Sequence, residues 1–256
     1  MTLLAADFIA KLYTFIWPLA RITAALMTVP VLSVEAANSR VRLMLSLALA
    51  ALVFPMFNWP TVDPMSTQGI AILVNEIAIG IIIGLVLQVA TASLLLAGQT
   101  ISSSMGLSIA TLLDPTFGNV PTIAQMLLIL GTLIFLGMGG HLLIVSILFD
   151  SFTMLPVGQH LLTLESIHSL LVWGSMIFLG ALLISLPLMA SLLLINLGLG
   201  VVTRAAPSLN IFVVGLPATI LAGFLLMIIS LESITNRIQW IWLQSFTKIR
   251  EILGLG

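Results

Sequence analysis

The stretch that decides the fold is residues 70–97, IAILVNEIAIGIIIGLVLQVATASLLLA, in which Glu76 is the single formal charge. A transmembrane helix needs about 20 consecutive, mainly apolar residues, and this stretch is longer than that. Its apolar residues do not alternate strictly with polar ones, which disfavours a strand of a β-barrel. Because a chain in lipid has to satisfy its own backbone hydrogen bonds, we expect a helix here.

The rest of the chain has the same apolar character. Of its 256 residues, 60% are hydrophobic and 7% are charged, whereas a typical soluble chain is about 25% charged. A soluble domain of this size cannot bury so much apolar surface, so the composition indicates an integral membrane protein. The net charge of −1 argues against nucleic acid as a partner. The absence of cysteine excludes disulfides and thiolate chemistry.

We expect one all-α, membrane-associated domain over residues 1–256, built from helical hairpins. The apolar stretches that predict helices are 8–34, 42–57, 70–97, 124–149, 167–199 and 209–231. A further segment, 232–253, carries an apolar stripe at helical spacing and is predicted to lie along a partner or an interface. The stretches differ in length, and Pro187 is predicted to kink or break the fifth. Hairpins packed mostly against other protein therefore fit better than six separate lipid-facing spans.

The basic residues predict an orientation and also contradict it. Arginines after the first stretch (Arg40, Arg42) and after the fifth (Arg204) place these turns on the cytoplasmic side. Six crossings then put the C-terminus outside. The C-terminal segment nevertheless contains Arg237, Lys248 and Arg250. Either the number of crossings is wrong or the tail follows another rule, and we favour the second interpretation.

Several short motifs carry little functional information. Gly80 and Gly84 have a small-xxx-small spacing that lets helices pack closely, but this spacing is also common without such a contact. The glycines at 198 and 200 lack the third glycine of a nucleotide fingerprint and are interpreted as a helix end. No metal site is predicted, because the histidines and the carboxylate between 160 and 168 lack a completing ligand. No cofactor is expected.

The segment 98–123 is rich in glycine, serine and proline. Prolines break helices and glycines add backbone freedom, so a lipid-facing helix is not expected. Irregular backbone at membrane depth is tolerated where protein buries it or where it lines a water-filled cavity. The segment is therefore either a surface loop or a mobile pore loop whose apolar side chains occlude a channel.

Two blocks of this sequence resemble the FliR family of bacterial export-gate proteins. The first is MGLSIAT at residues 105–111, followed by Asp114, Pro115 and Gly118. The second is LLLINLGLGVVTRAAPSLNIFVVGLP at residues 192–217, which is long and specific. Length and hydrophobic layout agree with that family over essentially the whole chain.

The resemblance implies a subunit of the flagellar type III secretion export gate in the bacterial inner membrane, at the flagellar basal body. There it would form, with FliP and FliQ, a gated channel for unfolded flagellar proteins, with FlhB around it and FlhA nearby. The family's central loop helps to plug the pore. That role falls here on Met105, Gly106, Leu112, Leu113, Asp114, Pro115, Phe117 and Gly118. The hairpin tip and subunit contact would involve Gly200, Arg204, Pro207, Asn210 and Phe212.

Other functions stay open at this point. The injectisome counterpart belongs to the same family, although the motifs are closer to the flagellar form. A small-solute or ion transporter would show internal repeats and paired buried charges near the midplane, and neither is evident beyond Glu76. A membrane-embedded hydrolase would need a nucleophile and a base, and the serines at 102–104 have no nearby histidine. We therefore expect no enzymatic activity.

Overall fold

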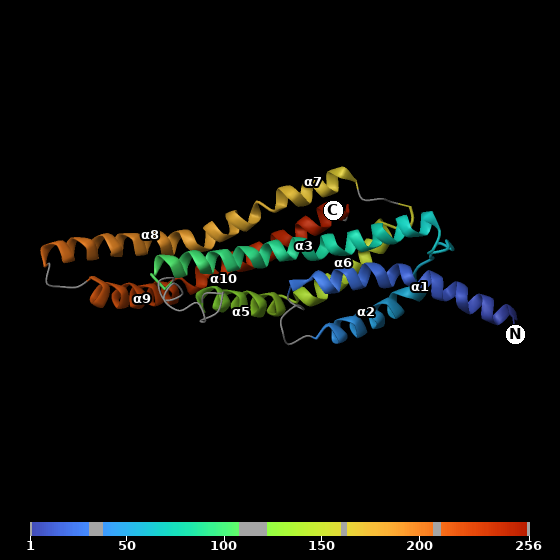
Figure 1. The fold of residues 1–256 in the computed structure, drawn as a ribbon, viewed down its shortest axis with the longest axis horizontal. Coiled ribbons are helices and arrows are strands. Elements are labelled where there is room, and N and C mark those ends of the chain that lie inside the picture. The colour runs from blue at the N-terminus through green and yellow to red at the C-terminus, as the bar shows by residue number, and fades with distance from the viewer. Residues whose placement is uncertain (1, 31–37, 108–121, 160–162, 207–210, 255–256) are drawn as a thin grey trace. The chain divides into compact units, whose positions relative to one another are not determined.

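The structure is a computed structural model that describes the backbone of residues 2–30, 38–107, 122–159, 163–206 and 211–254. Side chains are described from residue 11 onward, except those of residues 211–213. Over these ranges the regular structure is helical and no strand is present, which confirms the all-α prediction (Figure 1). The helices are α1 (Thr2–Thr28), α2 (Ser39–Val53), the 3₁₀ turn η2 (Phe54–Met56), α3 (Thr67–Ser104), α5 (Thr122–Gly137), α6 (Gly140–Met154), α7 (Leu164–Trp173), α8 (Met176–Ala205), α9 (Ile211–Ile229) and α10 (Leu231–Leu253).

The chain divides into two compact units. Unit 1 comprises residues 1–89, 139–174 and 244–256, and unit 2 comprises residues 90–138 and 175–243. Within the described residues, three helices are long and apolar enough to cross a membrane, or up to five if two bent helix pairs each count as one span. Helices α3 and α10 each contribute one part to each unit.

Unit 1 has a core in which α1 and α2 pack together. Its buried residues are Trp17, Ile22, Leu26, Ala50, Val53, Ile72, Phe152 and Val157. Aromatic rings extend this core: the rings of Trp59 and Phe152 meet edge to face, with centroids 5.4 Å apart. Such contacts add about 0.5–1.5 kcal/mol beyond the burial of their area.

Helix α3 approaches α1 very closely at two glycines. A Cβ atom on Gly80 would lie 2.3 Å from the carbonyl oxygen of Arg21, and one on Gly84 would lie 1.9 Å from Thr28 Oγ1. Neither distance leaves space for a side chain. The absence of a side chain at these two positions thus sets the separation of the two helices.

Unit 2 is also held together by close helix packing. A Cβ atom on Gly98 of α3 would lie 2.2 Å from the Cα atom of Ala124 on α5. The indole of Trp242 on α10 donates from Nε1 to the carbonyl oxygen of Gly131 at 3.1 Å. Its ring packs on Phe135, with centroids 4.8 Å apart. Small residues and one buried indole thus connect α3, α5 and α10.

The structure departs from the predicted boundaries in two glycine-rich places. Helix α3 continues to Ser104, so the first seven residues of the expected 98–123 segment are helical. The reason is the contact of Gly98 with Ala124, in which a small residue serves helix packing rather than a loop. Gly200 was interpreted as part of a helix end, but α8 continues past it to Ala205. That interpretation was wrong, because an isolated glycine weakens a helix without ending it.

The helix interruptions also lie elsewhere than expected. Pro187 lies inside α8, which runs without a break from Met176 to Ala205. The stretch 167–199 is instead interrupted at Gly174, between α7 and α8. The stretch 124–149 is interrupted before α6, where Gly139 has a φ of 71°, a left-handed conformation that favours glycine.

Candidate functional site

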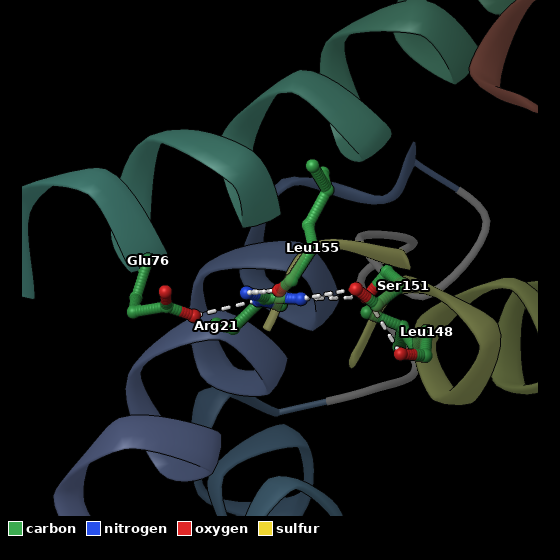
Figure 2. Close-up of polar contacts among 5 residues, drawn as sticks. All are labelled: Arg21, Glu76, Leu148, Ser151 and Leu155. Atoms are coloured by element: carbon green, nitrogen blue, oxygen red, sulfur yellow. Dashed lines mark hydrogen bonds and ion pairs between the residues drawn. The ribbon is translucent and has the colours of Figure 1, made fainter. Parts of the chain in front are cut away.

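A buried ion pair lies in unit 1 (Figure 2). Arg21 on α1 donates from Nε to Glu76 Oε2 on α3 at 2.7 Å, and both side chains are completely buried. The pair joins residues 55 positions apart in the sequence. Each charge in this apolar surrounding is therefore compensated by the other.

Arg21 also binds the C-terminal end of α6. Its Nη1 donates to the carbonyl oxygen of Ser151 at 2.8 Å and to Ser151 Oγ at 3.1 Å, and its Nη2 donates to the carbonyl oxygen of Leu155 at 2.9 Å. The guanidinium lies 4.3 Å from the ring centre of Phe152. The carbonyl oxygen of Ser151 also accepts from the N–H group of Leu155, and the negative end of a helix dipole favours a nearby cation. Arg21 thus connects α1, α3 and α6.

The second carboxylate oxygen of Glu76 remains unsatisfied. Oε1 is buried and has no hydrogen-bond partner within the described part of the chain. No group of three or more His, Cys, Asp or Glu side chains that could hold a metal is found there either. The ion pair is therefore equipped to hold helices together.

Sequence reasoning noted Glu76 and missed Arg21. One signal was available: Arg21 is the one arginine in the predicted helix 8–34, and Glu76 is the one acidic residue in 70–97. Helix 8–34 also contains Lys11, but Lys11 lies near the start of that stretch and Arg21 at its middle. Opposite charges inside two apolar helices are expected to pair, because each is costly alone in an apolar medium.

The C-terminal end of α3 is anchored in unit 2. Met105 is completely buried. Its carbonyl oxygen accepts a hydrogen bond from Thr219 Oγ1 of α9 at 3.3 Å. A Cβ atom on Gly223 of α9 would lie 2.6 Å from Met105 Cε, so this glycine makes room for the methionine side chain. The next residue, Gly106, has a φ of 80° and ends the helix.

A cavity of about 360 Å³ adjoins this anchor. It is lined by Ser103, Ser104, Gly106, Asn196, Leu199, Gly215, Leu216 and Thr219. The lining mixes hydroxyl and amide groups with leucines from α3, α8 and α9. The anchor therefore borders a partly polar space within unit 2.

The other predicted pore-loop residues follow directly after this anchor in the chain. Leu112, Leu113, Asp114, Pro115, Phe117 and Gly118 all lie outside the described residues. Of the pore-loop residues, the structure thus describes Met105 and Gly106, and it places both at the end of α3.

The predicted hairpin-tip residues are described in part. Gly200 lies in α8 with no atom within 4 Å of a Cβ placed on it. Arg204 is exposed in the last turn of α8. Pro207 and Asn210 lie outside the described residues, and Phe212 is described by its backbone, in α9.

Comparison with known proteins decides the family. The family model described as bacterial export proteins, family 1, matches residues 12–245. The chain belongs to this family. The flagellar biosynthetic protein FliR of Pectobacterium carotovorum is 36% identical over 248 residues, which cover 96% of this chain and 95% of the relative. The protein of that name from Escherichia coli is 35% identical, covering 97% and 95%, and the one from Bacillus subtilis is 28% identical, covering 92% of each.

The expected FliR family is thus confirmed over nearly the full length. This FliR-family chain is a flagellar export protein, and with its membrane-length helices it belongs to the export apparatus of the bacterial inner membrane. Proteins of this family are not enzymes. The ion pair and the α3 anchor are therefore to be understood as parts of an export machine.

Proposed function

We propose that this chain is a gate subunit that forms, with FliP and FliQ, a channel for unfolded flagellar proteins, with FlhB around it and FlhA nearby. The observation that carries this proposal is the anchor at Met105. The buried Met105, held by α9, fixes the start of the proposed plug, which runs from Met105 to Pro121. The family membership supplies the flagellar export context.

Exposed apolar side chains support an assembled state. In α8, Leu193, Leu194 and Leu197 are 59–71% exposed, and in α9, Leu225, Ile228 and Ile229 are 61–79% exposed. Large apolar areas on a chain of this kind require lipid or protein neighbours. Sister subunits are the neighbours that a multi-subunit gate provides.

The proposed mechanism is an apolar constriction that moves. A narrow apolar passage excludes water, and an ion entering it loses its hydration shell. Leu112, Leu113 and Phe117 supply the apolar side chains of the proposed plug, and Pro115 and Gly118 are residue types that favour irregular backbone. A passing polypeptide pushes the plug aside, and no covalent chemistry is needed.

A photo-crosslinking experiment tests the plug. A crosslinking amino acid replaces Phe117, and an export substrate is stalled in the channel of cells that still export. We expect a crosslink to the substrate at position 117. The matched control is Leu164 at the start of α7, which is 85% exposed and not part of the proposed plug. A working exporter without a crosslink at 117 contradicts the plug role.

Co-purification tests the partners. We expect the full chain, extracted in detergent, to bring down FliP and FliQ as one stable particle.

Loss of motility without loss of solute uptake in a deletion strain is expected for a flagellar gate. A loss of solute uptake instead would favour a transporter, for which a buried charge pair such as Arg21 and Glu76 is typical. That pair is enclosed and binds backbone carbonyls of α6, as a structural tie does.

A further inference from the structure

One carbonyl group in α8 lacks its helical donor. In an α-helix the N–H group of residue i donates to the carbonyl oxygen of residue i−4. Proline has no N–H group, so Pro187 cannot donate to the carbonyl oxygen of Leu183. This loss usually kinks or breaks a helix, yet α8 continues for 18 residues beyond Pro187 to Ala205. Another donor is therefore needed at Leu183.

That donor comes from α10. Nη1 of Arg237 donates a hydrogen bond to the carbonyl oxygen of Leu183. The Nε atom of the same side chain lies 3.4 Å from Ser233 Oγ, one turn earlier on α10, which orients the guanidinium. Both helices lie in unit 2 at this point. An arginine on a neighbouring helix thus occupies the role of the missing backbone N–H.

The two helices are packed closely enough for this bond to fix their register. A Cβ atom on Gly180 of α8 would lie 3.2 Å from Ile241 Cδ1 of α10. Gly180 lies one turn before Leu183 in α8, and Ile241 lies one turn after Arg237 in α10. The apolar contact and the hydrogen bond are therefore neighbouring points of one interface.

The hydrogen bond lies between an apolar surface of α8 and a partly polar cavity. Arg237 and Leu183 are half-buried and border an open cavity of about 630 Å³, whose other lining residues are Ile229, Glu232, Ser233, Asn236 and Trp240. The residues on either side along α8, Leu182 and Leu186, expose more than half of their surface and are apolar. A carbonyl without a donor is unfavourable wherever it faces an apolar environment.

We propose that Arg237 is a positioning residue that replaces the backbone donor removed by Pro187 and so fastens α8 to α10. The bond is releasable, because a side chain can leave the carbonyl while both helices stay intact. With Arg237 in place α8 is supported across Pro187; without it α8 is free to bend there. The charge of Arg237 then serves helix packing, and it is not evidence of a cytoplasmic C-terminus. This inference does not depend on the proposed gate.

A double-mutant cycle tests the proposal directly. The full-length chain is purified in detergent as four forms: unchanged, Arg237→Met, Pro187→Ala, and the double variant. The ratio of folded to unfolded protein is measured by titration with SDS. We expect Arg237→Met to lower this ratio about ten- to a hundredfold in the proline background, as for a hydrogen bond with a charged donor. In the Pro187→Ala background we expect Arg237→Met to lower this ratio by less than about threefold, because the alanine N–H group now donates to the carbonyl oxygen of Leu183.

Two controls make the outcome specific. Pro18→Ala adds the same N–H group to α1, far from Leu183 in the sequence, and is expected not to rescue Arg237→Met. Arg250→Met removes an exposed charge from the last turn of α10 and is expected to change the ratio less than threefold, as a surface charge does. If Arg237→Met yields no folded protein, the double variant is still expected to fold. An equal loss in both backgrounds, rescue by Pro18→Ala, or failure of the double variant overturns the proposal.

Discussion

Arg21 Nε and Glu76 Oε2 lie 2.7 Å apart on side chains from which solvent is excluded. The carbonyl oxygen of the same Arg21 residue lies against Gly80, one turn after Glu76 in α3. The charge pair and the glycine contact therefore act on the same stretch of α1. Together they fix how α1 and α3 are aligned, and a change at either is expected to disturb the other.

The ion pair predicts that two substitutions, one at each partner, lower the free energy of unfolding by different amounts. Arg21→Met leaves Glu76 buried without a counter-charge and removes the hydrogen bonds to Ser151 and Leu155, so we expect a loss of about 3–5 kcal/mol in the free energy of unfolding. Glu76→Gln keeps an amide oxygen that can accept a hydrogen bond from Arg21 Nε. We therefore expect Glu76→Gln to lower the free energy of unfolding by less than Arg21→Met does. SDS titration of the purified chain measures both, with the exposed Arg40→Met as a control.

Removing both charges is a separate test of the same pair. We expect the Arg21→Met, Glu76→Met double variant to be no less stable than Arg21→Met alone, because the uncompensated carboxylate is gone. A further large loss on adding the Glu76 change would contradict the pairing and show that Glu76 stabilises unit 1 through other groups.

The close approach of α3 to α1 predicts that Gly80 tolerates no side chain. A Cβ atom there would meet backbone, which cannot rotate away as a side chain can. We expect Gly80→Val to cost about 3 kcal/mol or more, at the upper end of the range for overpacking. Yield and unfolding in detergent check this, and Gly198→Val in α8, where nothing lies within 4 Å, serves as the matched control.

A substitution at Gly200 distinguishes an effect on folding from an effect on subunit assembly. Because the space around it is open within this chain, we expect Gly200→Leu to leave the unfolding midpoint nearly unchanged. The family resemblance implies a subunit contact at Gly200, so we expect the same variant to lose co-purification with FliP and FliQ. A variant that is both stable and fully assembled would remove Gly200 from the proposed contact.

The anchor of α3 predicts a change in the accessibility of residue 105. The chain has no cysteine, so a single cysteine introduced at Met105 is its one thiol. We expect this buried thiol to react slowly with a maleimide, and to react at least about tenfold faster when Gly223→Val occupies its space, since exposed thiols are the reactive ones. Ser103→Cys, at an exposed position of α3, should react fast with and without Gly223→Val.

Features of the candidate site could be predicted where they depend on one short segment, and not where they depend on contacts between distant residues. Glycines, prolines and a family motif predicted a pore loop in segment 98–123, and the structure shows that α3 extends into this segment as far as Ser104. Arg21 was missed because its role depends on Ser151 and Leu155, about 130 residues further along the chain. No pattern within one helix indicates such partners.

The sequence alone determined that this protein is helical, membrane-embedded and a member of the FliR family, because apolar run length and motif order are properties of the chain itself. Only the tertiary structure decided which charges are compensated and where helices stop. Pro187 was expected to kink or break the helix; α8 is not broken there, and a donor 54 residues away binds the carbonyl oxygen of Leu183. Helix continuity at a proline depends on what packs beside it, and that is fixed by contacts between distant segments.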